Sequence, residues 1–182
     1  MTASVAMPYS MENQPFKRRT VMPVPAVIEG AAQNFRYNDK FLADCHRGLS
    51  EEEWRRRPSD CSNSLTWVVG HLVWARKRIL DHLDTEWSTP WLDQFARGRK
   101  PETDALPTSA ELATAWTEVS GLLATALENA SEETLARPAT QGPPSADGKL
   151  SGVINFLAWH ETYHVGQAAY LRCWLGHKSI MG

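Results

Sequence analysis

Two histidines four residues apart carry the clearest chemical signal in this 182-residue chain, in the segment His160-Glu161-Thr162-Tyr163-His164. On an α-helix, residues four apart lie about 40° apart and one turn above each other, so both imidazoles can reach one ion. Apolar neighbours place both in the middle of the core-facing stripe, among them Val153, Phe156, Leu157, Leu171 and Trp174. A buried imidazole without a partner costs about 1–3 kcal/mol. The pattern predicts a metal site, and its alternative is a pair of core histidines bound by carbonyls or hydroxyls.

The same five residues spell HExxH, the zinc-protease motif, with Glu161 as its general base. The downstream sequence argues against a protease, because the longer motif needs a glycine and a histidine where this chain has Gln167 and Tyr170. No Asp or Glu follows Glu161, so the carboxylate ligand of related proteases is missing as well. A third ligand must come from elsewhere in the chain.

The second long helical segment supplies that third candidate, His71, which lies on a face with Trp67, Val68 and Trp74. His82 shares the face but lies eleven residues further on, about 16 Å along the axis, so one ion cannot bind both. His71 is the better candidate because it lies in the more apolar half of the segment. Three neutral imidazoles with open positions form a catalytic type of site, where a bound water or thiol loses its proton near neutral pH.

Five further residues are candidates for the site, and each also has a structural interpretation. Glu161 lies at the edge of the histidine face, as a general base or hydrogen-bond acceptor, or as a surface carboxylate. Gln167 lies one turn along, where it would bind substrate or a ligand water, or join two helices. Asn38 would approach the site or form a plain interhelical hydrogen bond. Trp67 would line the pocket or pack in the core, and Arg78 would bind an anionic cofactor or carboxylate substrate, or point to solvent.

Four helical segments must position these residues. Hydrophobic periodicity predicts helices over residues 26–48, 63–83, 108–127 and 151–176. Their predicted end signals are the capping boxes Ser50–Glu53 and Thr108–Glu111, N-caps at Asn63 and Ser151, and a terminal Gly176. The long connection over residues 85–107 is expected to be functional or interfacial. The prediction is an all-α four-helix bundle over residues 25–182, preceded by a poorly ordered or extended arm over residues 1–24.

The composition is that of an ordinary globular domain, with 42% hydrophobic and 22% charged residues and a net charge of -2. Basic residues occur only in short runs such as Arg76-Lys77-Arg78, interpreted as solvated helix surface, so nucleic acid is not expected as a partner. The 3 cysteines show no CxxC spacing, which favours a reducing compartment. Without a signal peptide or an apolar stretch of about 18 residues, we expect a cytoplasmic protein with no membrane partner.

Several segments together resemble the DinB/YfiT-like metal-binding four-helix bundles, over residues 30 to 178. N-S-L-T-W-V-V-G-H-L, from Asn63 to Leu72, is similar to the family's segment that ends in Gly-His. H-E-T-Y-H-V-G-Q, from His160 to Gln167, resembles its HxxxH-x-G-Q signature. Tyr37-Asn38 and the run L-S-E-E-E-W-R-R-R-P, from Leu49 to Pro58, are also similar to the family. The order and spacing of these fragments carry the resemblance.

The resemblance implies a metal site of His71, His160 and His164 that binds one divalent ion, zinc or nickel foremost, and a homodimer. Characterised relatives include transferases that join bacillithiol or mycothiol to electrophiles, and a mycothiol-dependent maleylpyruvate isomerase. It therefore implies a metal-dependent transferase or isomerase that uses a low-molecular-weight thiol and a small-molecule substrate. The alternatives are a hydrolase that uses metal-bound hydroxide and a non-catalytic metal- or ligand-binding stress protein. A bundle with satisfied core histidines and no metal remains the plainest alternative.

Overall fold

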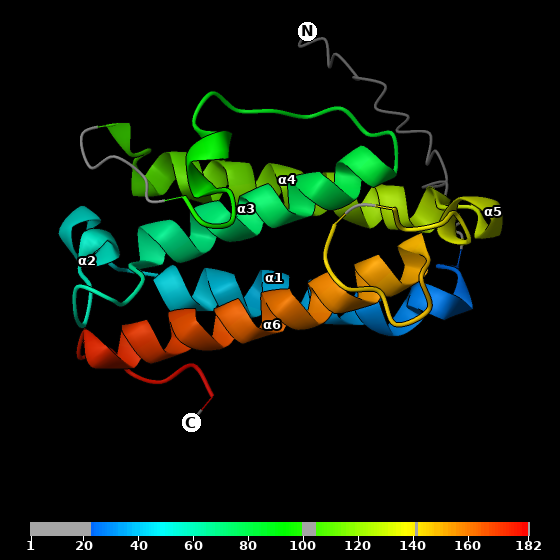
Figure 1. The fold of residues 1–182 in the computed structure, drawn as a ribbon. Coiled ribbons are helices and arrows are strands. Elements are labelled where there is room, and N and C mark those ends of the chain that lie inside the picture. The colour runs from blue at the N-terminus through cyan, green and yellow to red at the C-terminus, as the bar shows by residue number, and fades with distance from the viewer. Residues whose placement is uncertain (1–22, 100–104, 141, 182) are drawn as a thin grey trace, which may run out of the picture.

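The computed structural model describes residues 23–99, 105–140 and 142–181, and in them the chain forms a helical bundle (Figure 1). Its long helices are α1 (Glu29–His46), α3 (Leu65–His82), α4 (Ser109–Asn129) and α6 (Leu150–Trp174). The short helices are η1 (Ala26–Ile28), α2 (Glu51–Arg55), η2 (Leu92–Phe95) and α5 (Glu132–Leu135). The described residues contain no strand, so the predicted all-α four-helix bundle is confirmed. All but the last two residues of the predicted N-terminal arm lie outside the described residues.

The four long helices form two layers, with α1 beside α6 and α3 beside α4 (Figure 1). α1 and α6 run in the same direction, because Val27, Asn38 and Cys45 bond in that order to Asn155, Thr162 and Arg172. α3 also packs on α6, and α1 also packs on α4, which closes the bundle. The described part of the connection after α3, residues 83–99, runs back along the bundle (Figure 1). No helix in the described ranges is long and apolar enough to cross a membrane.

Side-chain caps define several of the helix ends. The two predicted capping boxes, at Ser50 and Thr108, are confirmed, and Gly176 takes the positive φ of 91° that ends α6. Two predicted N-caps are wrong by one or two residues. Ser64 caps α3 in place of Asn63, because the Ser64 hydroxyl accepts from the Trp67 N–H. α6 begins before Ser151, whose side chain is buried and donates to Asp147 instead of capping the helix.

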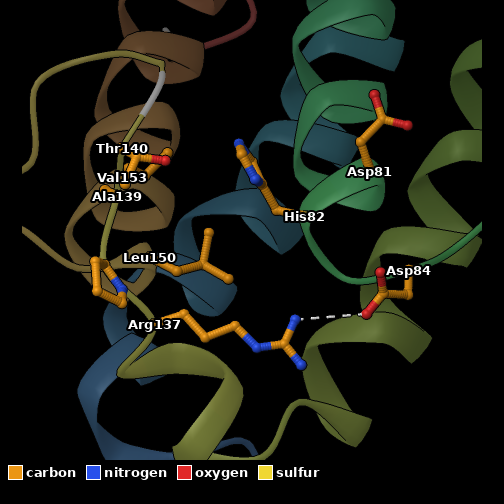
Figure 2. Close-up of a pocket in the computed structure, with 9 residues that line it drawn as sticks. Asp81, His82, Asp84, Arg137, Ala139, Thr140, Leu150 and Val153 are labelled. Carbon is orange, nitrogen blue, oxygen red and sulfur yellow. Dashed lines mark ion pairs between the residues drawn. The ribbon is translucent and has the colours of Figure 1, made fainter.

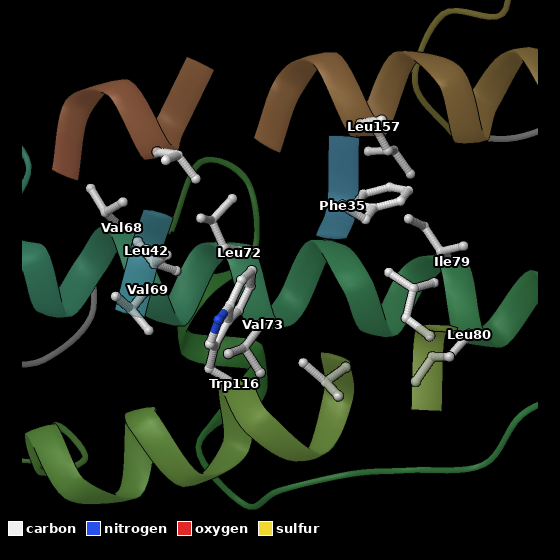
Figure 3. Close-up of a cluster of buried hydrophobic side chains, with 14 of the residues drawn as sticks. Phe35, Leu42, Val68, Val69, Leu72, Val73, Ile79, Leu80, Trp116 and Leu157 are labelled. Carbon is white, nitrogen blue, oxygen red and sulfur yellow. The ribbon is translucent and has the colours of Figure 1, made fainter. Parts of the chain in front are cut away.

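The hydrophobic core lies between the two layers and includes side chains from all four long helices (Figure 3). α3 contributes on several sides, since Val68, Val69, Leu72 and Val73 are all fully buried. A helix that is apolar on most of its circumference must be surrounded by neighbours, which explains the central place of α3 in the bundle. His71 is carried on this central helix and is therefore fixed by the packing around it.

Arg76 lies on α3 inside the core, with 1% of its surface exposed, so the prediction that its basic run lies on a solvated surface is wrong for this residue. Its Nε and Nη2 atoms donate to the two Glu161 carboxylate oxygens of α6, each at 2.7 Å. Nη1 donates to Asp39 on α1 at 2.6 Å and to the Ser120 hydroxyl on α4. The guanidinium also lies 3.8 Å from the ring centroid of Trp116. One arginine therefore bonds to each of the other three long helices.

Replacing Arg76 by methionine is expected to lower the free energy of unfolding by about 3–5 kcal/mol, because Glu161 would remain buried and charged without its partner. Adding Glu161→Leu should restore much of this loss, since the unpaired buried charge is then removed. Arg78→Met is the matched control on the exposed side of α3 and should change stability by no more than about 0.5 kcal/mol. Urea unfolding followed by tryptophan fluorescence measures the stability of the three variants. Equal effects of Arg76→Met and Arg78→Met would contradict a stabilising role of the buried Arg76–Glu161 pair.

Candidate metal centre

His71 of α3 and His160 and His164 of α6 meet at one point in the bundle. One ring nitrogen from each lies within 4.8 Å of the other two. The Nε2 atom of His160 lies 3.3 Å from Nε2 of His71 and 3.1 Å from Nε2 of His164. His71 and His164 are buried, while His160 is partly exposed. The three residues predicted as metal ligands are therefore brought together, with their Nε2 atoms facing a common centre.

The ring of His71 is held in place by a backbone carbonyl and two indoles. Its Nδ1 atom donates to the Phe95 carbonyl of η2 at 2.8 Å. Trp67 and Trp74, one turn before and one turn after His71, stack on the ring with centroid distances of 4.7 and 5.5 Å. Because the carbonyl can only accept, Nδ1 carries the hydrogen and the Nε2 lone pair points to the centre.

A side-chain relay holds the ring of His164. Its Nδ1 atom donates to the Gln167 amide oxygen at 2.8 Å, and the Gln167 amide nitrogen donates to the Tyr163 hydroxyl at 3.0 Å. This fixes the same tautomer as in His71, with the Nε2 lone pair free. His160 has no such partner among the described residues for its buried Nδ1 atom, and its ring stacks on Phe156 with a centroid distance of 6.4 Å.

Burial keeps all three imidazoles neutral at physiological pH. Loss of solvation is the main cause that lowers the pKa of His71, and it lowers the pKa of His160 and of His164 to about 4. The neighbouring histidines lower the pKa of His160 further, followed by the charge of Arg97. Neutral imidazole is the form that binds metal ions.

The donor set fits a divalent cation. His160 Nε2 can carry at most one hydrogen, so it cannot satisfy both of its Nε2 neighbours, which present lone pairs. A cation at the centre would be bonded by all three nitrogens at once. Two nitrogens on one tetrahedral zinc ion, each at about 2.0–2.1 Å from it, lie about 3.4 Å apart. The separations of 3.1 and 3.3 Å are close to that value.

A glycine brings η2 close enough to contact His71. A Cβ atom at Gly70 would overlap the ring of Phe95, far inside van der Waals contact. Phe95 is fully buried against this position, and its carbonyl is the one that accepts from His71. The absence of a side chain at Gly70 therefore permits the hydrogen bond that orients the neighbouring ligand.

The structure separates the other predicted site residues into two groups. Trp67 and Gln167 both contact the histidines directly. Asn38 does not, because its amide donates to Thr162 at 3.2 Å in the interface of α1 and α6. Both oxygens of Glu161 are bound by the buried Arg76, so this carboxylate belongs to the hydrogen-bond network of Arg76 in the core, called the core network below. Arg78 is half exposed and lies 3.6 Å from Asp81, about 10 Å along α3 from His71.

Two features of the site lie in the long connection after α3 and were not predicted individually. The Phe95 carbonyl is a backbone group, and the side-chain pattern of a sequence does not indicate which carbonyl approaches a histidine. Arg97 lies close enough to His160 for its charge to lower the His160 pKa. The sequence signal available for both was the length of this connection, which indicated a functional role for the segment without naming residues.

His82 lies in a different environment. It lines a cavity of about 290 Å³ together with Asp81, Asp84 and Arg137, and none of the three clustered histidines lines it (Figure 2). Arg137 reaches across this cavity to Asp84, with 3.6 Å between the charged atoms (Figure 2). This agrees with the prediction that His82 and His71 do not share an ion.

The comparisons with known proteins place these features in a family. The family model described as DinB superfamily matches residues 40–168, which include all three histidines. The chain therefore belongs to the DinB superfamily.

Among solved structures, the chain is similar to a conserved protein from Enterococcus faecalis, with a TM-score of 0.62 and 17% sequence identity. The match covers 80% of this chain and 95% of that protein, and it supports the fold alone. No curated protein matches the chain.

The contact of Gly70 with Phe95 makes a prediction for metal affinity. Gly70→Ala should displace η2 and weaken the His71 hydrogen bond, and loss of such an orienting partner lowers metal affinity about 10–100-fold. Gly121→Ala is the matched control, because it is a helical glycine with nothing within 4 Å of the added Cβ. Zinc affinity measured by competition with a chromogenic chelator should fall for the first variant only. Equal affinities of both variants, with the fold intact, would show that the close packing of η2 does not serve the site.

Proposed function

We propose that the three histidines bind one divalent metal ion, zinc or nickel foremost, and that the protein is a transferase or isomerase dependent on a low-molecular-weight thiol. The observation that carries the proposal is the convergence of three Nε2 atoms, with the lone pairs of His71 and His164 fixed by hydrogen bonds at Nδ1. When bound, the ion would lower the pKa of a coordinated thiol or water molecule into the neutral range.

The residues around the triad have separate tasks in this proposal. Phe95 and Gln167 orient two ligands through hydrogen bonds. The rings of Trp67, Trp74 and Phe156 pack on the histidines and would limit the access of water to the ion. The charge of Arg97 lowers the His160 pKa, and in this proposal the same charge would favour a negatively charged sulfur or substrate oxygen at the site.

The surroundings of the triad favour thiol chemistry over hydrolysis. A hydrolase of this type needs a carboxylate or a similar base that removes a proton from the attacking water. Glu161 is the carboxylate next to the ligands in sequence, and both of its oxygens are bound by Arg76. In the described residues no Asp or Glu joins the histidine cluster. A thiol needs less assistance from a base, because its pKa is far below that of water even before a metal ion lowers it.

Conjugation of a chromogenic electrophile such as 1-chloro-2,4-dinitrobenzene should require both a metal ion and a thiol. We expect His160→Ala to abolish stoichiometric metal binding and reduce the rate to the background without enzyme, because two imidazoles hold an ion poorly. His82→Ala is the matched control, a half-buried histidine outside the triad, and should retain both properties. Metal content and rate are measured on the same preparations, with cysteine, glutathione, bacillithiol and mycothiol as thiols.

The results separate the proposal from its alternatives. Hydrolysis of activated esters without any thiol, lost in His160→Ala, would replace the transferase by a hydrolase. Metal binding without either activity would leave a non-catalytic binding protein. Absence of stoichiometric metal after incubation with zinc and nickel would overturn the metal centre itself.

We also propose that the chain forms a homodimer through the outer face of α6. Trp159, Tyr163 and Tyr170 lie on one stripe of this face and are 55–63% exposed, which is unusual for large aromatic side chains. Gly166 lies between them, with nothing within 4 Å of its added Cβ, so a second helix can approach closely there. The Tyr163 hydroxyl accepts from Gln167, so this face is connected to the ligand His164.

Tyr170→Glu should therefore shift the protein from dimer to monomer, because an unpaired charge is costly to bury in a helix interface. Tyr37→Glu is the control, since Tyr37 is 53% exposed on α1 and lies outside this face. Light scattering after size-exclusion chromatography measures the mass of each. A monomeric unmodified protein, or a dimer that survives Tyr170→Glu, would count against this interface.

A further inference from the structure

A second cavity lies next to the metal centre. It has a volume of about 580 Å³ and opens between the connection from α2 to α3, the first turn of α3 and the segment after η2. This volume is within the range of pockets that bind small molecules. Neither the core network nor the histidine triad explains why a cavity of this size exists here.

The charged residues that line this cavity are mostly cationic. Arg55, Arg57 and Arg99 line it, against the single carboxylate of Asp60. Arg55 is paired with Glu51 at 2.9 Å, which leaves the guanidinium groups of Arg57 and Arg99 for a ligand of the cavity. The first turn of α3 also borders the cavity, and the N-terminal end of an 18-residue helix adds partial positive charge. Guanidinium groups bind carboxylates and phosphates through paired hydrogen bonds, so this lining favours an oxyanion.

The cavity and the metal centre share two residues. Trp67 lines the cavity and stacks on His71 with a centroid distance of 4.7 Å. Phe95 also lines the cavity, and its carbonyl accepts from His71. A ligand in the cavity would therefore contact two residues that hold His71, Trp67 through its ring and Phe95 through its backbone carbonyl. The anion-binding role predicted for Arg78 is better served here, since Arg78 lies on the exposed side of α3 near Asp81.

We propose that this cavity is an oxyanion subsite, which binds a carboxylate or phosphate group of the small molecule that reacts at the metal centre. The statement about the reacting molecule rests on the proposed function, whereas anion binding by the cavity does not. The substrate class is then an acidic small molecule, held at one end by Arg57 and Arg99 and directed past Trp67 toward the histidines.

Cys61 provides a local probe, because it is exposed and lines the cavity. Cys173 is also exposed but lies on α6, outside the cavity, and Cys45 is buried. In metal-free full-length protein, succinate or inorganic phosphate should slow alkylation of Cys61 by iodoacetamide and leave the rate at Cys173 unchanged. Peptide mass spectrometry measures both rates in one sample. Succinamide, the uncharged analogue of succinate, should not protect Cys61.

Paired variants test whether the arginines cause the protection. The double variant Arg57→Ala with Arg99→Ala should raise the anion concentration needed for half-maximal protection of Cys61 about tenfold or more. This is the loss expected from one charge-assisted hydrogen-bonded pair. Arg78→Ala with Arg137→Ala removes the same charge from exposed positions that do not line this cavity, and should leave protection unchanged. Comparing succinate with phosphate shows which oxyanion the subsite prefers.

The outcomes distinguish this subsite from the proposed function. Equal protection by succinamide, equal protection of Cys173 or an equal loss in both paired variants would overturn the subsite, whatever the metal content of the protein. Protection that depends on Arg57 and Arg99 would support it. If that protection is found in a protein that binds no metal, the proposed function fails while the oxyanion site stands.

Discussion

The structure depends on the burial of one charged group, the Arg76 guanidinium. A buried arginine is tolerated only when its donors are bonded and its charge is paired, because the cost of desolvation is several kcal/mol. Arg76 meets this requirement only if α1, α4 and α6 all supply acceptors at once, through Asp39, Ser120 and Glu161. Apolar packing tolerates small sliding movements of helices, whereas the bidentate bond between Arg76 and Glu161 is lost when the helices slide. The network thus selects one register of the bundle.

That register determines the geometry of the histidines. Glu161 directly follows His160 in α6, and Arg76 lies five residues after His71 in α3. The bond from Arg76 to Glu161 therefore fixes the position of α6 along α3 at a point about 7.5 Å along the helix from His71. His71 on α3 then faces His160 and His164 on α6 at a fixed separation. The ion pair and the imidazoles lie at different places in the same helix interface. The bundle pre-organises the site before any ion arrives.

The sequence predicted the bundle and the three histidines because both depend on local periodicity and residue type. Helix spacing alone placed His160 and His164 on one face, and the apolar surroundings of His71 identified the third. The burial of Arg76 was not predictable in this way, since a run of three basic residues is usually a solvated surface. Its burial requires acceptors from three other helices, and no single segment contains that information. For the same reason, Glu161 was expected either to serve the metal site or to lie on the surface, whereas its partner Arg76 lies in the core.

The sequence did not predict how individual residues of the long connection after α3 contribute to the site. A helix places side chains by its period, but an irregular segment places them by the few contacts that hold it. Here that contact is the fit of Phe95 against Gly70, which a sequence shows only as a glycine in a helix and an aromatic residue twenty-five positions later. The segment then contributes a backbone acceptor, the charge of Arg97 and the lining residue Arg99. The histidines come from the rigid helices, and the features that distinguish one ligand from another come from a segment held by packing. A protein with this fold can therefore change its substrate through the connection while the metal centre stays the same.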